Sequence, residues 1–337
     1  MSKHMVFLVH GMGDAQPGWS SSVWKQLAEQ YAGLEHDHLW PWDQSFSCHE
    51  ILYNDCFDTV RQQWLDDMPA ALAVLEAAGV NKTTRDKLQK LSDAQGAQQF
   101  LQTHVLDVIL YRFVELVRDA VRARVGLQIT SALLSVPSGT PWSLIAHSLG
   151  TSVAHDTLHA LYLPRENGIP GVKPAHLVTM LANVSRTLQT DSKPYESLVH
   201  PGPGGEGVTN HFLNVRHRLD PVPACWPFQP ADDWPTTELR ATGRFVHLDL
   251  SAITEPNVHA FEHYLRDPAC YVELFRKLTI PELITDDEER SLFGDFLAKH
   301  QLADRILKKR RKELEQLQPE PATPWHKILE VFHAMSL

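Results

Sequence analysis

The chain alternates between short apolar runs and longer stretches in which apolar residues recur at helical spacing. Each short run ends at a polar or glycine-containing loop, which is typical of a parallel strand buried on both faces. The runs lie at residues 4–10, 50–54, 142–146, 176–181, 211–217 and 244–250. Strands that alternate with helices predict an α/β fold, here a mainly parallel six-strand sheet with helices on both faces. We expect the sheet to begin directly with the strand that carries His10.

Two regions add helices to this sheet. Residues 57–135 precede the third strand and contain few glycines or prolines, and their helical spacing predicts a large helical insertion. That insertion, or the loop over 182–210, is a candidate cap over a site at the strand ends. Residues 281–337 predict a helical C-terminal extension. The sequence therefore predicts one α/β domain over 1–280, followed by this extension.

A serine at the start of a predicted helix is the first candidate for chemistry. It lies in Ala146-His147-Ser148-Leu149-Gly150, directly after a predicted strand. Small residues on both sides of Ser148 permit the strained strand-turn-helix that presents a nucleophilic hydroxyl, although Ala146 replaces the first glycine of G-x-S-x-G. The helix start also favours an anion through its dipole and free N–H groups. The alternative is a chance small-x-Ser-x-small sequence in a turn.

A second glycine-containing loop, HGMGD at residues 10–14, follows the first strand. Acyl transfer through a tetrahedral intermediate requires backbone N–H groups that point at the developing oxyanion. We expect one such group from Leu149, directly after the serine. We expect the other from Met12, because Gly11 beside it permits close approach of the backbone.

The same loop has two other interpretations. Gly-Met-Gly also occurs as an ordinary strand-to-helix turn and as part of the dinucleotide fingerprint G-x-G-x-x-G. The fingerprint needs a third glycine where this chain has Gln16, which disfavours nucleotide binding. His10 and His147 flank the two loops at strand ends, where we expect them to support the loops rather than to transfer protons.

Three motifs together resemble the α/β-hydrolase superfamily, specifically its lipase- and esterase-like members. They are HGMGD after the first strand, IAHSLGT around the serine, and LDPVP after a later strand. The matching segments run from about residue 5 to 280, but the motifs cover only a small part of them. The resemblance implies hydrolysis of an acyl ester without a cofactor, by a nucleophile, an acid and a histidine in that chain order.

The acid in this order is predicted to be Asp220. It lies 72 residues after Ser148, at the exit of the run 211–217, and Pro221 follows it. A carboxylate in this role holds the imidazole tautomer and stabilises the imidazolium. An Asx-turn residue that caps the proline-rich loop is the alternative interpretation. Asp249 lies inside the last predicted strand, where we expect a structural partner.

Two histidines follow the last predicted strand. His259 comes 39 residues after Asp220 and directly after the loop EPN, at a junction between loop and helix. From there it can fold back over the strand ends and reach the serine. His263 lies one helical turn further on. We predict His259 as the general base, with His263 as the backup.

Composition narrows the range of partners. With 31 basic and 41 acidic residues the net charge is −10, so nucleic acid is not an expected partner. Four cysteines without a CxxC pair, and the lack of an apolar stretch of roughly 18 residues, predict a reduced cytoplasmic protein. His36-Asp37-His38 lacks a third ligand at a suitable spacing, so neither metal nor cofactor is expected. Acidic residues interrupt the basic stretch within 302–318, so membrane contact is not expected there either.

We therefore predict a serine hydrolase that cleaves a carboxylic ester or lipid acyl bond through an acyl-enzyme intermediate. Thioester hydrolysis or acyl transfer would use the same three residues with a different leaving group or acceptor. A non-catalytic α/β-hydrolase scaffold that binds a ligand is the alternative outside enzymology. Trp40, Trp42 and Trp64 are candidates to line an acyl pocket, although core packing is the commoner fate of tryptophan.

Overall fold

The structure of the 337-residue chain is a computed structural model. It describes residues 3–35, 37–77, 79–80, 82, 85–86, 89, 106–163, 173–188, 193–202, 207–224, 227–230, 234–255, 257–279 and 284–300. Most of the predicted C-terminal extension, including 302–318, lies outside the described residues.

Six parallel strands form one sheet in the order β2-β1-β3-β4-β5-β6. The strands are β1 (His4–Val9), β2 (Phe46–Ile51), β3 (Trp142–His147), β4 (Ala175–Leu181), β5 (Thr209–His217) and β6 (Phe245–Leu250). This arrangement confirms the predicted α/β fold with a six-strand parallel sheet. The strand order reverses between β1 and β3, and the carboxyl ends of strands at such a switch point are where ligands bind in open α/β sheets.

The second strand lies earlier in the chain than predicted. We placed it at residues 50–54, but β2 spans Phe46–Ile51 and pairs only with β1 in the described sheet. Its two end residues are buried and the four residues between them are half-buried. This edge strand has Ser, Cys, His and Glu in its middle and therefore no continuous apolar run. We located strands by such runs, so its position was predicted wrongly.

Alternation along β1 divides the core into two layers. Met5, Phe7 and Val9 point to one face of the sheet, and Val6 and Leu8 to the other. All five side chains are almost fully buried. The period of two in strand side chains therefore places a hydrophobic core on each face, as a parallel sheet requires.

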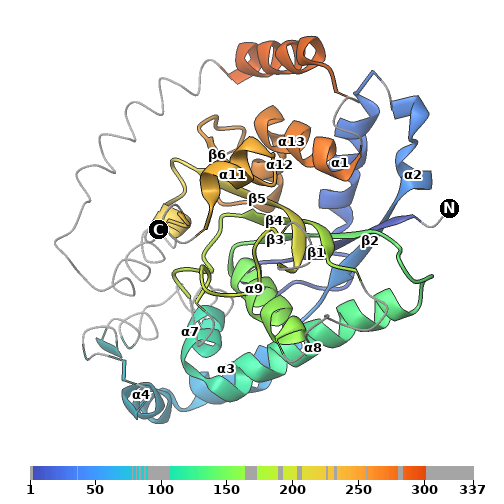
Figure 1. Cartoon of the computed structure of the whole chain (residues 1–337). Coiled ribbons are helices and arrows are strands. Elements are labelled where there is room, and N and C mark those ends of the chain that lie inside the picture. Colours follow the sequence, from blue (N-terminus) through green and yellow to red (C-terminus); the bar gives the residue numbers. More distant parts are fainter. Residues whose placement is uncertain are drawn as a thin grey trace.

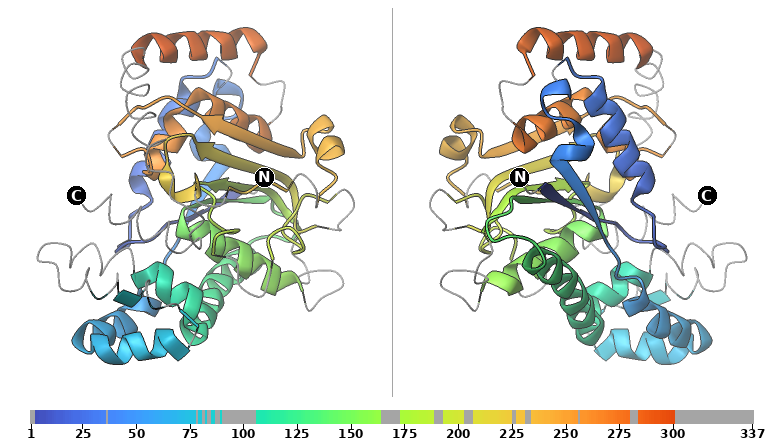
Figure 2. Two further views of the ribbon diagram at one scale, coloured as in Figure 1. Left: turned by 90° about the vertical axis from the view of Figure 1, so that its left-hand side faces the viewer. Right: turned by 90° about the vertical axis from the view of Figure 1, so that its right-hand side faces the viewer.

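Helices cover both faces of the sheet (Figures 1 and 2). α1, α2, α12 and α13 cover the face of Val6, and α3, α4, α7, α8 and α9 cover the face of Phe7. Within the described part of the chain, no helix combines the length and the apolar character needed to cross a membrane. The helices are α1 (Ser21–Ala32), α2 (Trp42–Ser45), α3 (Asp55–Asp66), α4 (Met68–Ala77), α7 (Leu106–Phe113), α8 (Glu115–Leu134), α9 (Leu149–Tyr162), α10 (Pro221–Ala224), α11 (Thr236–Ala241), α12 (Phe261–Arg266) and α13 (Pro268–Leu278), with a 3-10 turn η1 (Asp37–Leu39) and a further helix over residues 286–300.

The region predicted as an insertion, 57–135, supplies the helices α3, α4, α7 and α8. Val121, Val125 and Ile129 repeat every four residues along the buried side of α8. Gly126 lies where α9 passes, because a Cβ atom there would meet the side chain of Leu161 at 3.4 Å. The insertion thus packs on the helix that follows Ser148, and a role as a cap stays a prediction.

Candidate active site

Ser148 lies at the turn between β3 and α9 with a backbone that few residues adopt. Its φ is 53° and its ψ is −127°. A non-glycine residue held in such a sparsely populated region costs about 1–3 kcal/mol and persists only when its surroundings enforce it. Here the Ser148 N–H donates to Leu181 O at 3.0 Å, and the Thr151 hydroxyl donates to Ser148 O at 2.7 Å. The strain is the one that a strand-turn-helix around a nucleophile needs.

Two glycines allow the first loop to lie against this turn. A Cβ atom on Gly150 would lie 2.1 Å from His10 O, which no side chain can tolerate. A Cβ atom on Gly11 would lie 2.9 Å from Ser148 Cβ. The HGMGD loop and the serine turn therefore touch through their backbones, and both glycines are sterically required.

His259 lies between Ser148 and Asp220. Its Nε2 is 2.8 Å from Ser148 Oγ, and its Nδ1 is 2.6 Å from Asp220 Oδ2. All three side chains are buried, with exposed fractions of 1%, 8% and 0% for the serine, the histidine and the aspartate. We call this group the Ser148 row. With Nδ1 protonated toward Asp220, Nε2 has a lone pair that faces the serine hydroxyl.

Asp220 is held as an anion by more than the histidine. Tyr264 donates its hydroxyl hydrogen to Asp220 Oδ2 at 2.6 Å, and the Val222 N–H donates to Oδ1 at 3.0 Å. Burial alone would raise the pKa of Asp220, but the charge and hydrogen bond of His259 together with these two donors hold it below its usual value. Sequence reasoning missed Tyr264, which comes from α12.

The structure separates the two candidate histidines. His263 is 1% exposed, and its Nδ1 lies 2.7 Å from the Thr254 hydroxyl, not at the serine. Burial first, and the neighbouring His217 second, lower the pKa of His263 to about 4. Asp249, the competing acid, forms an ion pair with Arg216 at 2.8 Å. Of the sequence candidates, the structure therefore brings together Ser148, His259 and Asp220.

A small cavity borders Ser148. Among the described residues its lining apart from the serine is apolar and comes from five segments: Met12, Val108, Leu149, Val184, Leu188 and Val222. Leu149 is the first residue of α9, so its N–H has no acceptor within the helix. The two residues predicted to donate to an oxyanion thus border the cavity that Ser148 borders, and their role stays a prediction.

The two histidines at the strand ends pack against neighbouring aromatic rings, and their role in supporting the loops stays a prediction. The His10 ring stacks on the Tyr53 ring at 4.1 Å, and His147 stacks on Phe261 at 5.1 Å and lies 4.9 Å from the ring of His259. Burial is the main cause that lowers the pKa of His10 to about 4 and that of His147 to about 3. Both rings are therefore neutral at neutral pH.

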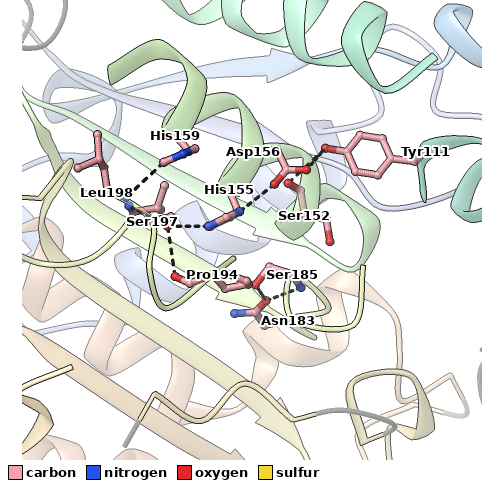
Figure 3. A network of polar contacts seen from close by, with 11 residues as sticks. Tyr111, Ser152, His155, Asp156, His159, Asn183, Ser185, Pro194, Ser197 and Leu198 are labelled. Atoms are coloured by element: carbon pink, nitrogen blue, oxygen red, sulfur yellow. Dashed lines mark hydrogen bonds and ion pairs between the residues drawn. The ribbon is translucent and has the colours of Figure 1, made fainter. Parts of the chain in front are cut away.

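A second row of serine, histidine and aspartate lies between α9 and the loop that follows β4 (Figure 3). His155 Nε2 is 2.8 Å from Ser197 Oγ, and His155 Nδ1 is 2.9 Å from Asp156 Oδ1. Tyr111 of α7 donates to the other oxygen of Asp156 at 2.8 Å. We call Ser197, His155 and Asp156 the Ser197 row. Sequence reasoning missed it, because His155 and Asp156 lie inside α9, which was considered only as the helix that follows Ser148.

The remaining candidates lie away from the cavity. Trp42 and Trp64 are buried in the two hydrophobic cores, and Trp40 is 42% exposed, so the suggestion that they line an acyl pocket was wrong for the described cavity. Among the described residues, no group of three or more His, Cys, Asp or Glu side chains could hold a metal ion. Within the motif His36-Asp37-His38, His36 lies outside those residues.

No known protein family, no curated protein and no solved structure matched the chain.

Proposed function

We propose that the chain is a serine hydrolase, similar in fold and chemistry to the α/β-hydrolases, that cleaves a carboxylic ester or lipid acyl bond. The observation that carries the proposal is the position of the His259 imidazole, 2.8 Å from a strained serine and 2.6 Å from a buried carboxylate. A nucleophile hydrogen-bonded to a base, which a third group orients, is the arrangement that activates a serine hydroxyl.

The reaction follows from these contacts. Ser148 Oγ attacks the ester carbonyl carbon while His259 Nε2 takes the hydroxyl proton. Asp220 stabilises the imidazolium, and the N–H groups of Met12 and Leu149 bind the oxyanion. The imidazolium then protonates the leaving alcohol, and an acyl-enzyme remains. Water attacks this ester with His259 again as the base, which releases the carboxylic acid and restores the serine.

The described lining of the cavity favours a neutral, apolar acyl group. Valine and leucine side chains lie beside the serine, and the described part of the wall contains no charged residue. A charged acyl chain would lose its hydration there without gaining a partner. Esters of short aliphatic acids are therefore the first substrates to assay.

A fluorophosphonate probe tests the proposal, because it reacts with activated serines and leaves ordinary hydroxyls unmodified. We expect labelling at Ser148, identified by peptide mapping, and its loss in Ser148→Ala. Ser197→Ala is the matched control and should label like the wild type. A wild-type protein that stays unlabelled and hydrolyses no p-nitrophenyl ester would overturn the proposal and favour a ligand-binding scaffold.

The leaving group requires a second assay on the same proteins. Acyl thioesters and p-nitrophenyl esters of equal chain length would be compared by kcat/KM, with and without an added alcohol acceptor. We expect the oxygen esters to be cleaved with water as the acceptor. A strong preference for thioesters, or transfer to the alcohol, would replace the proposed reaction by the corresponding alternative on the same residues.

A further inference from the structure

Side chains outside the Ser148 row hold the loop at Met12 from both sides. On one side, the Tyr53 hydroxyl lies 2.6 Å from His10 O and 3.0 Å from Gly11 O, so its single hydrogen is shared between these two carbonyl oxygens. On the other side, the Gly13 N–H donates to Asp107 Oδ2 at 3.3 Å. The two peptide groups that flank the Met12 Cα atom therefore each have a buried side-chain partner.

Peptide planarity turns the first of these contacts into an orientation. In a planar trans peptide the C=O and the N–H point in opposite directions. The Gly11 oxygen and the Met12 N–H belong to one such group, so a partner that fixes the oxygen also fixes the N–H. Tyr53 shares its hydroxyl hydrogen between that oxygen and His10 O, and His10 Nδ1 lies 2.7 Å from the Gly11 oxygen. The Met12 N–H consequently points away from Tyr53, while Met12 itself borders the cavity at Ser148.

We propose that Tyr53 and Asp107 are positioning residues that aim the Met12 N–H at the oxyanion. Tyr53 fixes the peptide group that carries this N–H. Asp107 fixes the next peptide group, where Gly13 has a φ of 113° that L side chains rarely adopt. The inference rests on the proposed function, since it assigns two residues to the oxyanion site of that reaction.

The surroundings of Asp107 argue against a role in packing alone. The residue is 1% exposed, and its Oδ1 lies 3.1 Å from Arg61 Nη1 of α3. Burial raises the pKa of Asp107 to about 7, and Asp58 and Asp14 add to this, although Arg61 and the Gly13 N–H oppose it. A carboxylate in such a place is unfavourable compared with an apolar side chain of similar volume. The hydrogen bond that Asp107 accepts from Gly13 accounts for a carboxylate at this position, and it links α7 of the helical insertion to the loop at Met12.

Steady-state kinetics on folded variants test this assignment. The variants are Tyr53→Phe, Asp107→Leu and the conservative Asp107→Asn, whose amide oxygen can still accept from Gly13. Tyr111→Phe is the matched control, because Tyr111 is also a fully buried tyrosine, and its hydroxyl contacts Asp156 at 2.8 Å and Ser152 O at 3.4 Å, away from the loop. Each variant is assayed for kcat, for KM, for the thermal unfolding midpoint, and for its affinity for a trifluoromethyl ketone, which forms an oxyanion on the serine.

We expect Tyr53→Phe and Asp107→Leu to lower kcat by about tenfold to a hundredfold with KM little changed, which is less than the roughly 10²–10³-fold cost of removing an oxyanion donor outright. Affinity for the ketone should fall by the same factor, and Asp107→Asn should recover most of the loss. The inference is overturned if Tyr53→Phe keeps the wild-type kcat, or if Tyr111→Phe loses as much. Absence of Ser148-dependent turnover in the wild type would instead overturn the proposed function, and this inference with it.

Discussion

The Ser148 row and the Ser197 row contain the same three residue types in the same order of hydrogen bonds. The histidine-to-serine distance is 2.8 Å in both, and the histidine-to-aspartate distances are 2.6 Å and 2.9 Å. A tyrosine hydroxyl donates to the aspartate in each row. Hydrogen-bond geometry alone therefore does not distinguish a candidate active site from a structural network in this molecule.

The difference lies in the serine and its surroundings. Ser197 Oγ lies 3.2 Å from Pro194 O (Figure 3). It also accepts from the Val199 N–H at 3.2 Å, so its own loop provides two of its hydrogen-bond partners besides His155. Ser148 lies instead on a strained turn, borders an apolar cavity, and is followed by the free N–H groups of a helix start. Under the proposed function, access to the serine and a place for the oxyanion, rather than the three side chains, distinguish the Ser148 row from the Ser197 row.

Removal of the base of the Ser148 row should have the largest effect on turnover. His259→Ala is expected to lower kcat by about 10⁶-fold, because the oxyanion and binding contributions alone remain. His263→Ala, one helical turn away and bound to Thr254, should keep most of the activity. Turnover of a p-nitrophenyl ester measures both. The reverse pattern would leave the serine in place but move the base to His263.

The aspartates provide the next largest contrast. Asp220→Asn should lower kcat by about 10⁴-fold, because an amide favours the wrong imidazole tautomer. Asp156→Asn makes the same change in the Ser197 row and should leave kcat near the wild-type value while lowering the unfolding midpoint. Parallel ester assays and thermal melts on the two variants measure this. Equal losses of kcat would mean that the Ser197 row also acts on the reaction.

The Ser148 row could be predicted from the sequence because each member follows a strand end. Ser148, Asp220 and His259 come directly after strands or their loops, and in a parallel sheet those ends meet at one edge. The choice of His259 over His263 rested on reach, and the described contacts agree with it. The fold was predictable for the same reason, since alternating strands and helices leave few topologies.

The supporting residues could not be found in this way. Tyr53 follows an edge strand that has no apolar run, and Asp107 lies within a helix whose spacing predicted only packing. The Ser197 row joins a helix to a loop 42 residues further along the chain, and no local pattern encodes that contact. Side chains that act through tertiary contacts carry no periodic signal, unlike those that end a strand.

Acid should lower the free energy of unfolding through two buried histidines that lie beside the Ser148 row. His10 and His147 have pKa values lowered to about 4 and about 3 by burial, from 6.5. The unfolded chain therefore binds more protons below pH 6.5, so their stabilisation is complete above that pH and is lost as the pH falls toward the folded values. Each contributes a loss that approaches about 1.4 kcal/mol per pH unit between its unfolded and folded pKa values. Urea unfolding between pH 7.5 and 5.5 measures it, and a stability independent of pH would contradict the burial of neutral rings.

The smallest expected effect comes from Ser197→Ala. The substitution removes the hydroxyl that His155 Nε2 contacts at 2.8 Å and that accepts from the Val199 N–H, and it leaves both groups buried without that partner. An unsatisfied buried polar group costs about 1–3 kcal/mol, so the unfolding free energy should fall by roughly that amount. The kcat should stay near the wild-type value, because the loop still packs on α9 through Val199 and its neighbours. Loss of stability with unchanged turnover would establish a structural row, whereas loss of turnover without loss of stability would show that the two serine rows work on one reaction.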